Sequence, residues 1–126
     1  METKRIDNEH ISIWIEDDIV FVLFRPKVHY DLALARKVVA ERLQVTGNRR
    51  LCMIGDLTEM DPATKEARAY FSSEEATKNI ISGAFITPSK FIEIATNLWL
   101  SFNKPAVPVR LFTDKEKAIE WVKSYC

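Results

Sequence analysis

The chain has 126 residues, of which 47% are hydrophobic and 29% are charged, with only 3 glycines and 5 prolines. This composition is typical of a compact globular protein and excludes the disordered and fibrous classes. Eighteen basic residues balance eighteen acidic ones, and Lys and Arg cluster no further than pairs such as Arg49 and Arg50. We therefore expect neither nucleic acid nor an anionic membrane surface as a partner.

The length predicts one domain, residues 1–126, with one core. The N-terminal stretch METKRIDNEH is polar, and no apolar run approaches the roughly 18 residues that span a bilayer. We therefore expect a cytoplasmic protein without a membrane span. In that reducing compartment, Cys52 is expected to be a small buried hydrophobe with a free thiol, because the other cysteine, Cys126, is the last residue.

The first half of the chain predicts a β-hairpin, a helix and a third strand. Residues 10–16 alternate between isoleucines and more polar positions, the period of a half-buried strand. The apolar run IVFVLF at 19–24 predicts a second strand, buried on both faces. A helical pattern covers 31–46 and ends before Gly47, a typical C-cap residue. Residues 50–55 then form a short apolar strand, whose position we expect to be central.

The second half predicts helices that alternate with two further strands. Asp61 is a suitable N-cap and Pro62 a suitable first residue for the second helix, and SSEEATK at 72–78 indicates a further short helix or turn. IISGAFI at 80–86 is the fourth strand. Thr87-Pro88 repeats this cap-then-proline signal, and apolar residues at helical spacing up to residue 102 predict the helix that follows it. VRLF at 109–112 is the fifth strand, and TDKE at 113–116 is a capping box that begins the last helix.

These elements give the order β β α β α (α) β α β α. A hairpin followed by alternating strands and helices predicts an α/β domain with a mixed five-stranded sheet, whose later strands are largely parallel.

Several segments between residues 50 and 123 resemble the STAS-like superfamily typified by anti-sigma-factor antagonists, and more closely the small bacterial STAS/Sec14-type proteins. The segments that carry the resemblance are Asp56 after its strand, EARAYF at 66–71, SGAFI and TPS within 82–89, FNKPAVPVRLF at 102–112 and KAIEWVK at 117–123. The resemblance implies a STAS-like fold over the chain. None of these segments is a catalytic signature, so it informs the fold more than the function.

The loop after Asp56 is the first candidate site. In signalling members of the superfamily, the corresponding loop carries a hydroxyl residue that a partner kinase phosphorylates, which implies Thr58 as the phosphorylation site here. The glycine of that motif is absent, and Glu59 would repel a phosphate. A second interpretation is therefore that the Thr58 hydroxyl satisfies a nearby backbone group.

Arg68 and Trp14 are the other two candidate contact residues. Arg68 lies one turn into the second helix, where it can pair with Asp56 or Glu59 or hold an anionic ligand. Trp14 lies on the polar face of the first strand. An exposed tryptophan on an edge strand would be an anchor for a protein partner or for a second copy in a homodimer.

The sequence offers little for catalysis or metal binding. The only imidazole bases are His10 and His29, and neither lies in a catalytic motif. Metal-ligand spacings are absent, and three scattered glycines cannot form a phosphate loop. We expect no enzyme activity, no cofactor and no metal; a hydrolytic enzyme would require one of the histidines to approach Thr58 or Asp56.

Besides this hydrolytic enzyme, which comes third, two functions remain open from the sequence. The first is a non-catalytic regulatory or binding module that acts through protein contacts. The second is a carrier of a small molecule or lipid, with an apolar site between helices and sheet, as the Sec14-like side of the resemblance implies. The aromatic residues of the two middle helices either line such a ligand site or pack in the core, and we expect them to be in the core. They are Tyr70, Phe71, Phe91, Trp99 and Phe102.

Overall fold

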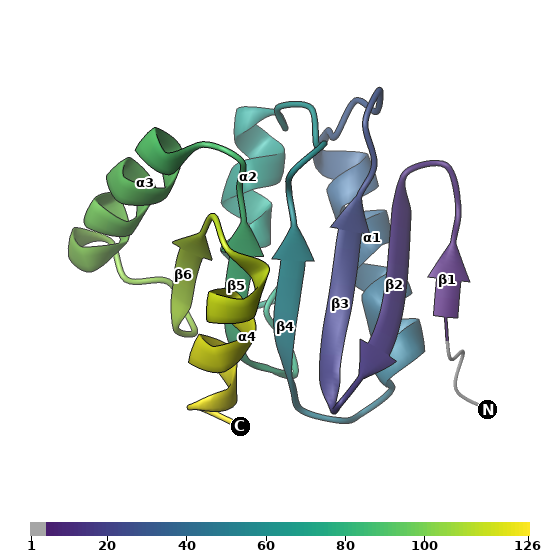
Figure 1. Cartoon of the computed structure of the whole chain (residues 1–126). Coiled ribbons are helices and arrows are strands. Elements are labelled where there is room, and N and C mark those ends of the chain that lie inside the picture. Colours follow the sequence, from purple (N-terminus) through teal and green to yellow (C-terminus); the bar gives the residue numbers. More distant parts are fainter. Residues whose placement is uncertain (1–4) are drawn as a thin grey trace.

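The structure is a computed structural model that describes residues 5–126 as one mixed β-sheet with four helices (Figure 1). The strands are β1 (Arg5–Asp7), β2 (Ile11–Glu16), β3 (Ile19–Phe24), β4 (Leu51–Asp56), β5 (Ile80–Ile86) and β6 (Val109–Phe112). The helices are α1 (Leu32–Thr46), α2 (Lys65–Phe71), α3 (Lys90–Phe102) and α4 (Lys115–Lys123). The strands lie side by side in chain order, antiparallel from β1 to β3 and parallel from β3 to β6.

The predicted α/β class, hairpin and mixed sheet are confirmed, but the sheet has six strands rather than five. The additional strand, β1, pairs with β2 from Arg5 opposite Trp14 to Asp7 opposite Ser12. Three residues are too few to show a hydrophobic period, which is why the sequence pattern does not reveal β1.

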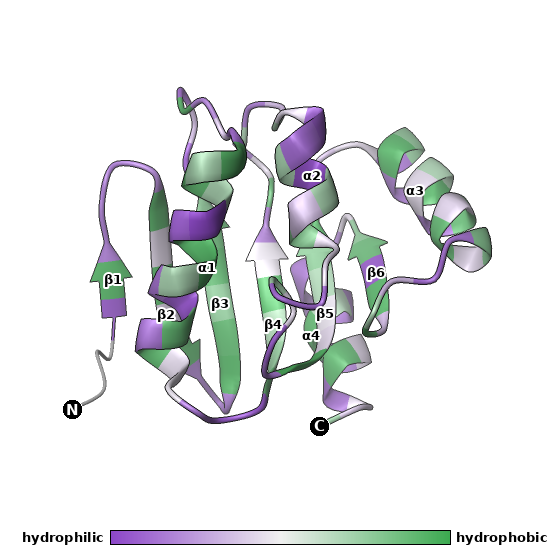
Figure 2. Cartoon of the chain, turned by 180° about the vertical axis from the view of Figure 1, so that it is seen from behind, coloured by the Kyte–Doolittle hydropathy of each residue, from purple (hydrophilic) through white to green (hydrophobic). Residues whose placement is uncertain are grey.

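The helices form layers on the two faces of the sheet, with one exception. Helices α1 and α2 cover one face, α4 covers the other, and α3 lies beyond the edge strand β6 (Figures 1 and 2). Figure 2 also shows that β3 is hydrophobic along its length, as a central strand buried on both faces should be. Within residues 5–126, no helix is long and apolar enough to cross a bilayer.

A separate hydrophobic cluster fills each face of the sheet. The cluster under α1 and α2 contains Ile11, Ile13, Val20, Val22, Phe24, Tyr30, Val38, Val45 and Leu51. The cluster under α4 contains Ile19, Phe21, Cys52, Ile54, Ala84, Ile86, Ala118 and Val122. Neither cluster includes a residue of α3, so the fold is stabilised by burial without that helix.

The caps of α1 confirm the predicted bounds of that helix. The Asp31 carboxylate accepts a hydrogen bond from the Leu34 amide at 2.9 Å, which satisfies one of the free amides of the first turn. At the other end, Gly47 has φ 60° and its amide donates to the Leu43 carbonyl at 2.8 Å, a backbone conformation that favours glycine.

The predicted start of α2 is wrong by three residues. The helix begins at Lys65, where the Thr64 hydroxyl accepts from the Ala67 amide at 3.1 Å. Asp61 does not act as the cap, because its carboxylate accepts from the Lys27 amide at 2.7 Å in another loop. The stretch SSEEATK forms turns rather than a helix.

The other helix starts also lie slightly later than the sequence indicates. Ser89 caps α3, accepting from the Ile92 amide at 3.2 Å, so the predicted Thr87-Pro88 start is wrong. Asp114, and not Thr113, caps α4 by accepting from the Glu116 amide at 2.8 Å. In both cases the nearer polar side chain of the same short run takes the cap position.

A buried arginine fixes the turns between α2 and β5. The Arg42 guanidinium on α1 donates to the Ala76 carbonyl at 3.1 Å and to the Lys78 carbonyl at 2.9 Å. Arg42 is buried, and this burial lowers its pKa to about 10. The side chain therefore connects α1 to a segment that has no regular secondary structure of its own.

Candidate functional site

The loop after β4 is a tight turn held by Asp56. Its carboxylate accepts a hydrogen bond from the Thr58 amide at 2.9 Å, and the Leu57 amide donates to the Ile86 carbonyl of β5 at 2.9 Å. This is an Asx turn, in which the aspartate mimics a backbone acceptor. The Asp56 side chain therefore shapes the loop, while Thr58 is exposed at its tip.

Arg68 is not brought together with the carboxylates of this loop. Its guanidinium donates to the Ala63 carbonyl at 2.6 Å, just before α2. Among the ion pairs of residues 5–126, none joins Arg68 to Asp56 or Glu59. The predicted pairing is therefore wrong, and the side chain braces the start of α2 instead.

Trp14 is only half-exposed, and its strand is not at the edge of the sheet. Strand β1 pairs outside β2, so the expected edge position is wrong. The indole stacks on Phe21 with ring centroids 5.4 Å apart, and the Arg5 guanidinium lies 4.9 Å from its ring. These contacts give the indole a packing role.

His10 makes a structural contact rather than approaching Thr58 or Asp56. Its Nε2 lies 2.7 Å from Oε1 of Glu41, and the Asn8 amide donates to Oε2 of the same carboxylate at 2.7 Å. The nearly buried Glu41 thus joins the start of β2 to α1. Within the described residues, no group of three His, Cys, Asp or Glu side chains is placed to hold a metal ion.

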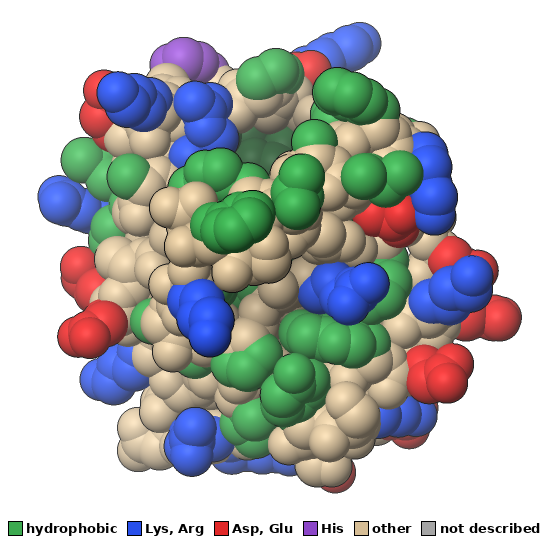
Figure 3. All heavy atoms as spheres, turned by 90° about the vertical axis from the view of Figure 1, so that its left-hand side faces the viewer, with side chains coloured by type: hydrophobic (Ala, Val, Ile, Leu, Met, Phe, Trp, Pro, Cys, Tyr) green, Lys and Arg blue, Asp and Glu red, His purple; other side chains and the backbone are tan. Residues whose placement is uncertain are grey.

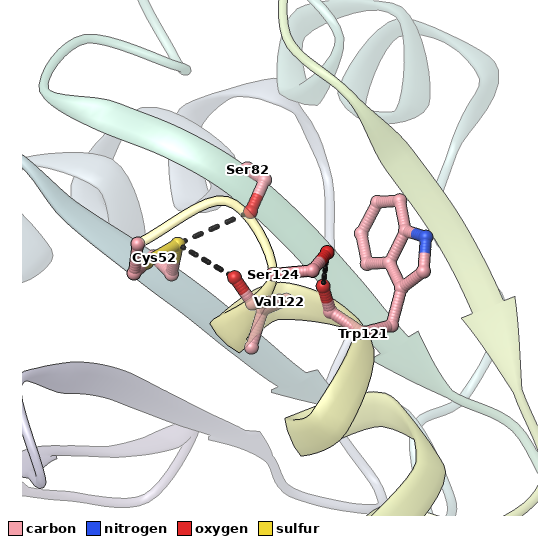
Figure 4. Close-up of a disulfide and its surroundings, with 6 residues drawn as sticks. Cys52, Ser82, Trp121, Val122 and Ser124 are labelled. Atoms are coloured by element: carbon pink, nitrogen blue, oxygen red, sulfur yellow. Dashed lines mark hydrogen bonds between the residues drawn. A yellow bond between two sulfur atoms is a disulfide. The ribbon is translucent and has the colours of Figure 1, made fainter.

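Cys52 is buried as predicted, but the free thiol is a wrong prediction because the structure pairs it with Cys126 in a disulfide. The link connects β4 to the end of the chain after α4 (Figure 4). The Ser82 hydroxyl lies 3.2 Å from the Cys52 sulfur, and the Val122 carbonyl lies 3.4 Å from it. The thiol of a reduced Cys52 can donate a hydrogen bond to the Val122 carbonyl, whereas a disulfide sulfur cannot. The surroundings of Cys52 therefore suit the reduced form as well.

The most unusual surface of the molecule lies on α3. Six large hydrophobic side chains of this helix are between 47% and 81% exposed, and the helix has no buried residue. At 100° per residue they fall within an arc of about 160°. We call this surface the α3 apolar face; it comprises Phe91, Ile92, Ile94, Leu98, Trp99 and Phe102. Figure 3 looks onto this end of the molecule, where hydrophobic side chains gather at the height of α3.

The opposite side of α3 explains why its apolar residues point outward. The Asn97 side chain donates to the Leu111 carbonyl at 2.9 Å and accepts from the Leu111 amide at 2.8 Å. The Glu93 carboxylate accepts from the Thr113 amide at 2.6 Å. Strand β6 is the edge of the sheet and would otherwise leave these backbone groups unpaired. The polar side of α3 therefore covers the sheet edge, and its apolar side faces away.

Sequence reasoning placed Phe91, Trp99 and Phe102 in the core, and the structure contradicts this. The helical spacing shows that they share a face but not which way that face points. The sequence signal is Asn97, which lies with Glu93 on the side of the helix opposite the apolar residues. Tyr70 and Phe71 are half-buried, and the Phe71 ring packs edge-on against Phe24 at 6.0 Å.

A groove of about 390 Å³ lies between α3, β6 and α4. Its charged lining residues are Lys90, Glu93, Arg110 and Lys117, and its other lining residues are Ile94, Asn97, Leu111 and Phe112. Lys90 pairs with Glu93 at 2.6 Å, and its hydrogen bond holds the pKa of that carboxyl below the usual value. The Arg110 guanidinium lies 5.7 Å from the Phe112 ring. The groove thus combines an apolar floor with an excess of positive charge.

The arrangement of the strands and helices identifies the fold class of the protein. An N-terminal hairpin that leads into parallel strands with alternating helices is a SpoIIAA-like α/β fold. The chain is similar to the crystal structure of an uncharacterized DUF3478-family protein with a SpoIIAA-like fold from Shewanella loihica PV-4. The identity is 18% and the TM-score 0.62, over 96% of this chain and 98% of that chain. The STAS-like resemblance is therefore confirmed at the level of the fold.

The family follows from the sequence itself. A family model described as a domain of unknown function, DUF7793, matches residues 13–126. The chain belongs to this family. No curated protein matches it in sequence.

Proposed function

We propose that this protein is a non-catalytic binding module that acts through protein–protein contacts, made by the α3 apolar face. The observation that carries the proposal is the size of this face. Taking about 200 Å² for a fully exposed large side chain, the six residues expose roughly 750 Å². The largest apolar patch of a typical monomer is about 300–600 Å², and larger patches mark interaction sites.

The chemistry of the face supports a protein partner. Phe91, Trp99 and Phe102 are aromatic, and aromatic residues are enriched at the centres of protein interfaces. Three of the four residues that the sequence singled out make contacts within the chain: Asp56 shapes its loop, Arg68 braces α2 and Trp14 packs on Phe21. The fourth, Thr58, is exposed, and its role as a contact or phosphorylation site stays a prediction. We therefore expect Trp14→Ala to lower stability while leaving association through α3 unchanged.

Site-specific photo-cross-linking in the host cell tests this proposal. A photoreactive phenylalanine analogue replaces Leu98 at the centre of the face, and a matched chain carries it at Ala40, an exposed residue of α1. We expect defined protein adducts from position 98 and none from position 40. The proposal fails if position 98 gives no protein adduct, or the same adducts as position 40.

The groove beside α3 favours a second candidate, a carrier of an amphipathic anion. Its volume of about 390 Å³ falls in the range of small-molecule sites. Arg110 and Lys117 have no carboxylate partner within 4.0 Å among the described residues, so an anionic head group could pair with them. The floor formed by Ile94 and Phe112 suits an apolar body.

Native mass spectrometry of protein purified from its own host tests the carrier. A dissociable adduct that disappears in Arg110→Glu, and persists in Lys37→Glu on α1, would support it. A clean apo mass would contradict it. The same spectrum reports whether the chain carries a phosphate, which adds about 80 Da, and fragmentation then tests whether that phosphate is on Thr58.

A further inference from the structure

We infer that the occupant of the α3 apolar face is a second copy of this chain, so that two α3 helices pack against each other across a two-fold axis. This inference rests on the proposed function and specifies its partner. It draws on the charge, the area and the position of the face.

The α3 apolar face carries no charged side chain. The only charged residues of α3 are Lys90 and Glu93, both on the side that faces β6 and paired with each other. In a two-fold contact each residue meets the same surface patch of its mate, so any net charge on the face would meet like charge. Interfaces between two different proteins commonly use complementary charges instead. A charge-free face on a chain of zero net charge is compatible with self-association.

The α3 apolar face is also large enough for a dimer interface. The roughly 750 Å² exposed by the six side chains is close to the ~800 Å² per partner of a standard stable interface. Interfaces of permanent homodimers are also more apolar than those of transient complexes. The exposed area is the most that the six side chains can bury, so a two-fold contact that covers the whole α3 apolar face approaches the area of a stable dimer interface and has its apolar composition.

The position of α3 leaves its apolar face accessible to a second copy. Helix α3 lies beyond the edge strand at one end of the molecule (Figure 1), and its contacts are with β6, chiefly through Asn97 and Glu93. The body of the protein therefore does not stand between two approaching α3 faces. A 13-residue helix that buries no residue in its own chain also has little to stabilise it alone, and packing against a second copy would supply that burial.

Light scattering coupled to gel filtration tests the inference on the purified full chain. We expect a dimer at about 10 µM, within the range of affinities that interfaces of this size reach. The double variant Trp99→Ser/Phe102→Ser should weaken dimerisation by more than a hundredfold, because aromatic residues at the centre of an interface carry much of its affinity. Both side chains are more than half exposed, so the variant should still fold. The matched control is Tyr125→Ser, which changes an exposed aromatic residue after α4.

An engineered cysteine tests the geometry. Ala95 is exposed at the middle of the helix, and a residue near a two-fold axis lies close to its own mate. Because the two native cysteines are paired, Ala95→Cys adds one free thiol, and oxidation should give a covalent dimer. Ala40→Cys on α1 should give none.

Three results would overturn the inference: a monomer at all concentrations, a dimer that the double variant leaves intact, or binding to phosphatidylcholine vesicles, with or without an added anionic lipid, in place of dimerisation. Protein adducts at position 98 together with a purified monomer would refute self-association only, and the protein-contact function would stand. Failure of both experiments would refute both proposals.

Discussion

Reduction of the Cys52–Cys126 disulfide should lower the thermal stability of the protein substantially. The link closes a loop of 74 residues in sequence, and it restricts the unfolded chain far more than the folded one. The chain-entropy relation gives about 4.4 kcal/mol for a loop of this length, whereas measured values are commonly 2–4 kcal/mol. For 126 residues, an unfolding entropy of about 2.1 cal/mol/K per residue converts 2–4.4 kcal/mol into a shift of about 8–17 °C in Tm.

The assay is thermal unfolding followed by circular dichroism, with and without a phosphine reductant, after a thiol count in denaturant has established the starting state. Cys126→Ser is the informative variant because Cys126 is exposed, so the change removes the link without opening the core. Cys52 then keeps its contacts with Ser82 and Val122. The variant should unfold at the Tm of the reduced wild type, and reductant should not change it further.

Two results would refute this reasoning. A chain that shows two free thiols even after mild oxidation would mean that the pairing does not form. A fully oxidised chain whose Tm moves by less than about 2 °C on reduction would mean that the closed loop does not limit the unfolded state. The Tm of Cys52→Ala should lie below that of Cys126→Ser, because Cys52→Ala also removes a buried sulfur atom.

Three further predictions concern the core. Gly55→Ala should cost about 1–3 kcal/mol in urea unfolding, because its new Cβ would lie 2.5 Å from the Phe85 ring; Gly83→Ala, 3.7 Å from the same ring, should cost less than about 1 kcal/mol, and equal effects would contradict the clash. Tyr30→Phe should lower the free energy of unfolding by about 1–3 kcal/mol, since the buried hydroxyl lies within hydrogen-bond distance of the His10 and Arg25 carbonyls. Burial raises the pKa of Tyr30 to about 12, so the wild type should lose its advantage over this variant as pH rises from about 10 to 12, where only the unfolded tyrosine ionises. Arg42→Met should destabilise the turns after α2, measured as faster hydrogen exchange at Ala76 to Lys78 than at β3, because two carbonyl partners are lost.

Local signals in the sequence predict most of the fold. Helix α1 was predictable at both ends because Asp31 and Gly47 have a single cap role each. The start of α2 was not, because Asp61 pairs with the Lys27 amide in a loop far away in sequence. Pairings of this kind depend on the tertiary arrangement, and a cap residue alone cannot reveal them.

The cysteine prediction failed for a related reason. Seventy-four residues separate Cys52 from Cys126, and nothing in that spacing shows that α4 returns the chain end to β4. The expectation of a cytoplasmic protein stays a prediction. If the disulfide forms in the cell, it argues against a cytoplasmic location, because structural disulfides persist mainly in oxidising compartments.

The orientation of α3 follows from the end of the sheet rather than from the helix. A helix that joins parallel strands ordinarily turns its apolar side to the sheet face. Within residues 5–126, no strand pairs with the outer side of the last strand, β6, so its free backbone groups require polar partners. Asn97 and Glu93 supply those partners, and they can do so only if Phe91, Trp99 and Phe102 point away. The same two side chains that protect the sheet edge thus create the apolar surface, so loss of Asn97 should loosen α3 and weaken any contact made through it.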